Sequence, residues 1–92
     1  MPILLKSNEE IDAIAEAGKI IIKVFDQVQE SVRVGMTTEM VGQKIKDLIT
    51  KEGGRPAFLG YRGFPGPVCI SINDEIVHGI PGSRSINDGD LV

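Results

Sequence analysis

The first third of the chain places apolar and polar residues with the period of an α-helix. Ser7 and Glu10 have the S-x-x-E spacing of a capping box, in which each side chain accepts a hydrogen bond from the other residue's backbone N–H. Charged residues occupy the opposite face, which predicts an amphipathic helix with one side on a core. The expected core side recurs every three or four positions, at Ile11, Ile14, Gly18, Ile21, Phe25, Val28 and Val32.

A second helix is expected after a break at residues 34–36. Thr37 or Thr38 can cap its first turn, because a threonine hydroxyl accepts a hydrogen bond from a free backbone N–H. Two glycines at residues 53–54 supply the left-handed stop that ends many helices. The expected buried side consists of Met40, Val41, Ile45, Leu48 and Ile49.

The character of the chain changes after the second helix. Residues 55–67 are rich in Gly, Pro and aromatic side chains, which excludes a long helix and predicts a short strand at 57–59 followed by a shaped loop. Residues 68–72 alternate and are rich in β-branched side chains, so they predict a strand. A turn at Asn73-Asp74 and a returning strand at 75–78 are expected to follow. We therefore expect an α/β (α+β) protein with two helices and an antiparallel β-hairpin region.

The last residues resemble the start of another strand. Residues 87–90 (Asn-Asp-Gly-Asp) predict a turn, and residues 91–92 leave room for only two strand positions. Because a strand needs partners along its whole ladder, we expect the C-terminus to be a truncation of a longer protein. An open sheet edge in such a fragment would favour self-association.

One inference about chemistry follows from the expected hairpin. With a two-residue turn, Cys69 pairs with His78, and paired side chains share one face of a sheet. His78, the only histidine, is either a hydrogen-bond or proton donor at a pocket or a residue that satisfies a local backbone group. Composition alone favours the second interpretation. Cys69 is better explained as a small buried side chain than as a nucleophile, since no third residue orients a Cys–His pair.

Three aromatic residues, Phe58, Tyr61 and Phe64, lie in the Gly- and Pro-rich loop. They are explained equally well as the wall of an apolar substrate pocket and as anchors that hold the loop on the core. The acidic residues sit on solvated helix faces or beside turn glycines, so the sequence predicts no metal site within this chain.

Composition narrows the function classes. The 92 residues carry a net charge of −3 and are 41% hydrophobic, which suits one small globular unit. Scattered basic residues argue against nucleic acid as a partner, and no apolar run is long enough for a signal peptide or a membrane span. A single cysteine excludes an internal disulfide, and a cytoplasmic location is the default expectation.

Three segments of the chain carry motifs with specific spacing, at residues 60–65, 71–81 and 88–92. Together they resemble type I methionine aminopeptidases, which implies that residues 1–92 are the N-terminal part of such an enzyme's catalytic domain. Residues 71–81 are similar to the S-I-N-x-x-x-x-H-G-I-P signature of that family. Residues 60–65 are similar to its G-Y-x-G-Y/F-P loop, and residues 88–92 to the D-G-D-[ILV]-V that leads into its first metal-binding strand. The resemblance extends over the whole chain.

The resemblance implies a fold, an activity and a cofactor. The fold is the pita-bread fold, with two pseudo-symmetric α/β halves around a two-metal centre. The activity is removal of the initiator methionine when the second residue is small. The cofactor is a pair of divalent ions (Co, Mn, Fe or Zn) held by two Asp, one His and two Glu. All five of these ligands would follow Val92, so the resemblance implies that this chain alone binds no metal and is inactive.

The resemblance also assigns roles by motif position. His78 resembles the family's conserved non-ligand histidine, which hydrogen-bonds the substrate and stabilises the transition state. Tyr61, Phe64 and Cys69 match pocket positions that hold the methionine side chain. Phe58 stands at a further pocket position where other members often have a smaller residue. The implied partners are N-terminal methionine peptides and nascent chains, without nucleic acid or membrane, and the full-length protein is expected to be a monomer.

Two alternatives stay open. One is a non-catalytic binding protein on the same pita-bread fold, which would lack the metal ligands in its full-length gene. The other is a related metallohydrolase such as a proline aminopeptidase. Those usually carry an extra N-terminal domain, whereas this sequence begins almost at its first helix. The intact H-G-I-P at residues 78–81 favours the aminopeptidase.

Overall fold

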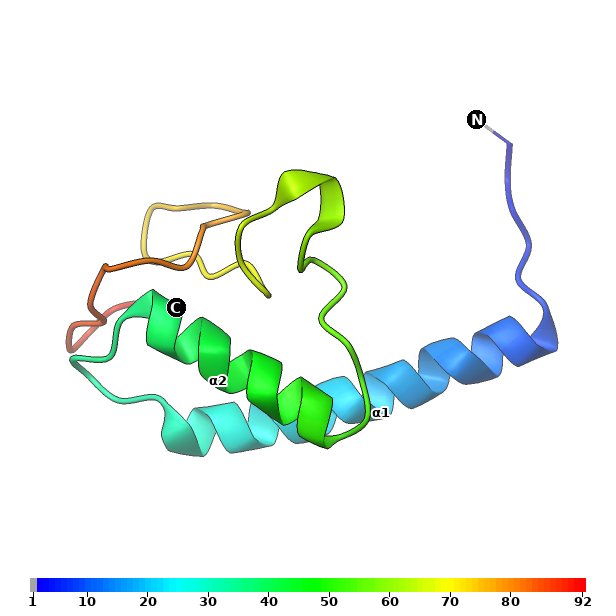
Figure 1. The fold of residues 1–92 in the computed structure, drawn as a ribbon, viewed down its shortest axis with the longest axis horizontal. Helices are drawn as coiled ribbons and strands as arrows, with labels where there is room; N and C mark the ends of the chain where they lie inside the picture. Colours follow the sequence, from blue (N-terminus) through cyan, green and yellow to red (C-terminus); the bar gives the residue numbers. More distant parts are fainter. Residues whose placement is uncertain (1) are drawn as a thin grey trace.

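Two helices, a short 3-10 helix and a long irregular segment, residues 64–92, make up the fold. The computed structural model describes residues 2–92, with α1 at Asn8–Ser31, α2 at Thr38–Lys51 and a short 3-10 helix, η1, at Tyr61–Gly63. The helices pack against each other, and the chain after η1 folds back over the first turns of α2, so that the C-terminus lies near the α1–α2 connection (Figure 1). Neither α1 nor α2 is long and apolar enough to cross a membrane.

The capping box predicted at the start of α1 is confirmed. The backbone N–H of Ser7 donates to Oε1 of Glu10 (2.8 Å), and the backbone N–H of Glu10 donates to Oγ of Ser7 (3.1 Å). The Ser7 N–H, assisted by the hydroxyl, holds the pKa of the Glu10 carboxyl below its ordinary value of 4.5. Glu10 therefore remains charged beside the positive end of the helix dipole.

The second helix also begins and ends as predicted. Of the two candidate caps, Thr37 is the one that accepts from the Met40 N–H, at 3.1 Å. Gly53 follows the helix with a left-handed φ of 89°. The other candidate, Thr38, is buried and contacts a distant part of the chain instead.

The core lies between α2, the end of α1 and the irregular segment. Its buried members are Val41 from α2 and three isoleucines of the irregular segment, Ile70, Ile72 and Ile86, of which Ile72 is completely buried. Partly buried side chains packed around them are Val32, Met36, Ile45 and Val68. The alternation predicted for residues 68–72 thus does place Ile70 and Ile72 inward, although no sheet forms there.

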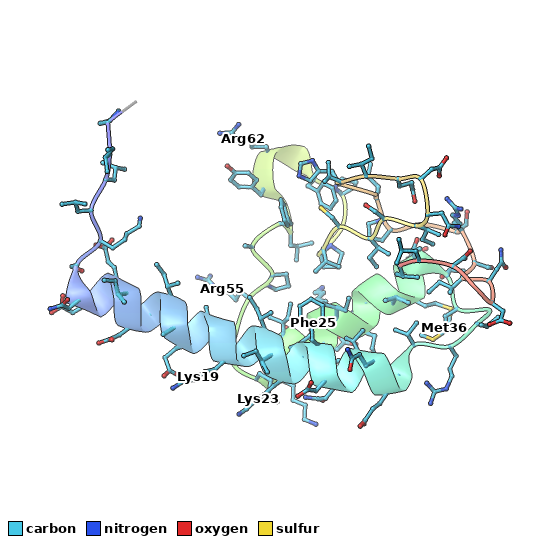
Figure 2. All side chains as sticks on the ribbon, turned by 180° about the vertical axis from the view of Figure 1, so that it is seen from behind. Lys19, Lys23, Phe25, Met36, Arg55 and Arg62 are labelled. Atoms are coloured by element: carbon cyan, nitrogen blue, oxygen red, sulfur yellow. The ribbon has the colours of Figure 1, made fainter. Side chains whose placement is uncertain are left out.

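The expectation for the apolar side of α1 is only partly correct. The predicted positions Val28 and Val32 are half-buried, but the one buried residue of this helix is Val24, which the prediction did not include. Four other predicted positions are more than half exposed: Ile11, Ile14, Ile21 and Phe25. Figure 2 shows Phe25 on the side of α1 that faces α2. The N-terminal half of α1 extends beyond α2, so no described residue covers its apolar positions (Figure 1).

The predicted strands do not form. Residues 57–59, 68–72, 75–78 and 91–92 form turns or irregular chain, and the β pairing among residues 2–92 is one isolated bridge between Thr37 and Ser85. Two paired strands alone are marginal in water, and left-handed backbone at Asn73 and His78 interrupts the ladder on the turn and on the returning arm.

The start of α2 supplies the hydrogen bonds that a sheet would otherwise provide. The N–H groups of Thr38 and Glu39, which have no partner within the helix, donate to carbonyls of Arg84 and Gly82 at 3.0 Å each. The Thr38 hydroxyl accepts from the Gly82 N–H at 2.7 Å. The irregular segment is therefore attached to a helix terminus.

We expect Ser7→Ala to loosen the first turn of α1. Loss of a serine cap costs about 1 kcal/mol, so the protection of the first helical amides against hydrogen exchange should fall roughly fivefold. Because the folded-state pKa of Glu10 is lowered, the stability that its carboxylate contributes to the folded state is complete above pH 4.5. This stability is lost as the pH falls through the folded-state pKa. Ser31→Ala, at the last residue of the same helix, is the matched control and should leave the first turn unchanged.

Candidate functional site

Successive tight turns gather the three aromatic residues. The N–H of Tyr61 donates to the Phe58 carbonyl (3.0 Å), and the N–H of Phe64 donates to the Tyr61 carbonyl (2.9 Å). Such i to i+3 turns place every third side chain on the same side. Gly60 and Gly63 adopt left-handed φ angles of 76° and 78°, which allow the turns to follow one another.

Phe58 is the centre of the resulting ring cluster. Its centroid lies 5.6 Å from Phe64, 6.4 Å from Tyr61 and 6.2 Å from the His78 imidazole. The contacts with Tyr61 and His78 are edge-to-face, at interplanar angles of 77° and 67°, the arrangement that aromatic quadrupoles favour. Three residues from the loop and one from a segment fourteen positions later thus form one cluster.

The backbone around His78 is held by a close approach between two chain segments. The N–H of Ile70 donates to the Gly79 carbonyl (2.9 Å), and the Gly79 N–H donates to the Ser71 hydroxyl (3.1 Å). A Cβ on Gly79 would overlap the Ile70 carbonyl oxygen. His78 itself has a left-handed φ of 57°, so its side chain departs from the alternation of a strand.

Pro81 anchors the other end of the H-G-I-P motif. A Cβ on Gly42 of α2 would lie 3.4 Å from the Pro81 ring, and one on Gly66 would lie 3.0 Å from it. The proline ring therefore packs between two glycines, and a larger side chain at either glycine position would crowd it. This packing connects the segment that bears His78 to α2 and to the loop that bears the aromatic rings.

Two adjoining cavities share Phe58 and His78 as lining residues. The first, about 390 Å³, is also lined by Tyr61 and Phe64. The second, about 540 Å³, is also lined by Cys69. The structure thus brings Phe58, Tyr61, Phe64 and His78 into one group, while Cys69 joins that group through the second cavity only.

The predicted register of the hairpin is wrong, although its turn is right. The N–H of Glu75 donates to the Ile72 carbonyl at 3.1 Å, which is the expected two-residue turn. Beyond the turn, the backbone hydrogen bond that joins Ile70 to the other arm goes to Gly79, two positions beyond the Val77 expected opposite Ile70. Cys69 and His78 border the same cavity, but they are not neighbours in a ladder.

Sequence reasoning did not select several residues that line these cavities. Arg62 and Ile80 border the first one, and the Arg62 guanidinium lies 5.3 Å from the centroid of the Tyr61 ring. Figure 2 shows Arg62 at the outer tip of η1. Asn73 and Leu91 border the second cavity. All four positions fall within the motifs at residues 60–65, 71–81 and 88–92, but only the folded chain brings them to the cavities.

The charged groups near the second cavity are carboxylates engaged by the backbone. The Asn87 N–H and the Asn73 amide lower the pKa of the Asp90 carboxyl from its ordinary value of 3.8, with a smaller contribution from Arg84. Glu75 accepts from the Ile72 N–H at 2.9 Å and lies 3.5 Å from the Arg84 guanidinium. Within residues 2–92, no three side chains of His, Cys, Asp or Glu gather where they could hold a metal ion.

Comparisons with known sequences agree with the motifs. A model of metallopeptidase family M24 matches residues 12–92. The chain is 43% identical over 90 residues to a methionine aminopeptidase of Clostridium perfringens, covering 98% of the chain and 36% of that relative. It is 39% identical over 90 residues to methionine aminopeptidase 1 of Bacillus subtilis, with the same coverage. The chain thus spans about 36% of the length of these relatives.

Solved structures show the same likeness in three dimensions. The methionine aminopeptidase of Rickettsia prowazekii superposes with a TM-score of 0.88 at 30% identity, covering 97% of this chain and 36% of the other. That of Thermotoga maritima gives 0.88 at 31% identity with the same coverage. The expected fold family, the pita-bread fold, is therefore confirmed although the individual strands are not.

We expect Gly79→Ala to displace the segment that bears His78. The added methyl would overlap the Ile70 carbonyl, and overpacking of this kind typically costs about 1–3 kcal/mol. Urea unfolding measures the loss of stability, and nuclear Overhauser contacts between the Phe58 and His78 rings report the displacement. Gly82→Ala is the control, since the nearest atom to its Cβ is 3.9 Å away. Equal stability of the two variants would contradict this account of the close approach.

Proposed function

This chain belongs to metallopeptidase family M24, and from that membership we propose that it forms part of a metal-dependent methionine aminopeptidase. The proposed reaction is removal of the initiator methionine from nascent polypeptides whose second residue is small. The observation that carries the proposal is the contact of the Phe58 ring with both His78 and Phe64, which joins a histidine to an aromatic cavity.

The proposed role of this chain is to bind and orient the substrate. It spans 36% of the length of its relatives, and their remaining length would supply the other side of the active site. We assign residues 1–92 to the N-terminal part of the catalytic domain of a type I enzyme. The H-G-I-P motif, anchored by Pro81 between two glycines, supports this assignment.

The aromatic cavity suits a methionine side chain. Thioether sulfur makes favourable contacts with aromatic rings, worth roughly 0.3–1.5 kcal/mol each, and the flexible chain adapts to an irregular space. Tyr61, Phe64 and Phe58 offer three rings around a cavity of about 390 Å³. Phe58 also lines the second cavity, which Cys69 borders, and we propose that its ring limits the length of the side chain that fits.

His78 is the proposed hydrogen-bonding group of the site. Its side chain is exposed to both cavities, and among residues 2–92 no hydrogen bond engages its imidazole. An imidazole with free ring nitrogens can donate to a peptide carbonyl and stabilise the charge that develops there. We propose that His78 holds the scissile carbonyl of a substrate whose methionine side chain lies against Phe64.

The residues described do not provide a metal centre. M24 enzymes are metallopeptidases, yet the acids and the histidine of residues 2–92 do not converge in a set of three. We propose that the complete enzyme uses two divalent ions, Co, Mn, Fe or Zn, whose ligands come from outside these residues. His78 then acts as a substrate contact and not as a ligand.

A chimera tests the proposed activity. Residues 1–92 joined to the remaining portion of the Clostridium perfringens relative should cleave Met-Gly-Met when Mn²⁺ or Co²⁺ is added. His78→Ala in that chimera should lower kcat/KM by about 10²–10⁴-fold, the usual contribution of a positioned acid–base group. Val34→Ala, at an exposed position that lines neither cavity, serves as the control. A folded chimera without activity would contradict the function, and an active one insensitive to His78 would contradict its role.

The isolated chain should bind but not cleave. With Mn²⁺ or Co²⁺ present we expect no hydrolysis of Met-Gly-Met by residues 1–92, because no described group holds the metal that would activate water. L-methionine amide should shift the NMR signals of Phe58, Tyr61 and Phe64 at lower concentration than L-lysine amide does, since an ammonium group is poorly accommodated in an apolar cavity. Clear turnover, or no preference for methionine, would argue against this division of roles.

A further inference from the structure

We propose that Asn73 is a positioning residue that clamps residues 90–92 to the turn before His78 and thereby holds one wall of the larger cavity. The clamp itself is independent of the reaction that the protein performs. Its importance for binding rests on the proposed function, in which this cavity borders the substrate.

Three hydrogen bonds make the clamp. The Asn73 N–H donates to the Leu91 carbonyl (2.9 Å), and the Leu91 N–H donates to Oδ1 of the Asn73 side chain (3.0 Å). The Asn73 side-chain Nδ2 donates to Oδ1 of Asp90, also at 3.0 Å. One residue thus engages two consecutive residues across seventeen positions of sequence, through its backbone and through both ends of its amide.

Asparagine meets all the requirements at this position, whereas glycine and aspartate do not. The backbone φ of Asn73 is 56°, a left-handed value that glycine, asparagine and aspartate tolerate best. Glycine has no side chain to offer. Aspartate presents two acceptors, of which one would face the Asp90 carboxylate, whereas the amide presents one donor and one acceptor.

The partner carboxylate is itself held in place. Oδ2 of Asp90 accepts from the Asn87 N–H at 2.8 Å, and the Asp90 N–H donates to the Asn87 carbonyl at 3.1 Å. These bonds close the turn at residues 87–90 on one side while Asn73 holds it on the other. The lowered pKa of Asp90 reflects the same contacts, with Arg84 as the charged group that also acts on it.

The clamp determines where residues 91–92 lie. Leu91 and Val92 line the larger cavity together with Phe58, Cys69 and His78. Leu91 is 74% exposed, so little apolar packing holds it. Its hydrogen bonds to Asn73 are therefore the main restraint on this wall, and loss of the amide would open the cavity near Cys69.

Replacement of Asn73 in the 92-residue chain tests the proposal. Asn73→Gly keeps the left-handed backbone and removes the amide, so the protection of the Leu91 N–H against exchange should fall about tenfold or more, since that N–H loses its acceptor and Asp90 loses its donor. The pKa of Asp90, followed by carboxyl NMR, should rise toward 3.8. Asn87→Ala is the control, because the backbone groups of Asn87 that bond Asp90 remain.

Asn73→Asp supplies a distinctive pH signature. Near neutral pH its second carboxylate oxygen would oppose Asp90, so Leu91 protection should be low. Protonation of the introduced carboxyl on acidification would restore a donor, and protection should recover relative to Asn73→Gly at the same pH. A simple loss of structure would show no such recovery.

The effect on the wall is measured at Cys69, the only thiol. Its reaction with a disulfide reagent should be several-fold faster in Asn73→Gly and unchanged in Asn87→Ala. Unchanged Leu91 protection and Asp90 pKa would overturn the clamp, and unchanged thiol reactivity would overturn its positioning role. If all three readouts change but L-methionine amide binds no variant, the clamp stands and the proposed function fails.

Discussion

The attachment of the irregular segment to the N-terminus of α2 is the constraint on which the site depends. Residues 64–92 have no ladder of their own, so their backbone polar groups need partners elsewhere. The first N–H groups of α2 are free by the geometry of any helix, and the carbonyls of Gly82 and Arg84 accept from them. The buried Thr38 completes the contact through its hydroxyl, and Ile72 and Ile86 pack with Val41 of the same helix.

The candidate site is built from turns, and this explains its composition. Gly60 and Gly63 permit consecutive turns that stack Phe58, Tyr61 and Phe64, while Gly79 permits two chain segments to approach at backbone distance. Such positions tolerate few substitutions because a Cβ would either strain the backbone or collide with a neighbour. The rings and the imidazole therefore gain fixed positions without the support of a regular sheet.

The apolar side of α1 is only partly covered within this chain. Ile21 and Phe25 border an apolar cavity of about 300 Å³ together with Ile45 and Ile49 of α2 and with Cys69. The sequence periodicity predicted burial for both α1 residues, and within residues 2–92 they remain more than half exposed. A periodic pattern records which face of a helix is apolar, whereas the burial of that face depends on what packs against it.

The sequence by itself determined the elements whose causes are local. The Ser7–Glu10 box, a threonine cap at residues 37–38, the Gly53 stop and the turn at Asn73 each depend on groups within a few residues, and all are present. The structure alone selected Thr37 over Thr38 as the cap. The H-G-I-P motif identified the family because its spacing is specific. Tertiary structure alone decided that the predicted strands do not form, which residues lie opposite each other, and where the cavities lie. The interactions responsible join residues distant in sequence: the Ile70–Gly79 contact, the ring cluster with His78 and the Asn73–Asp90 bond. Their energies depend on packing that local patterns do not encode.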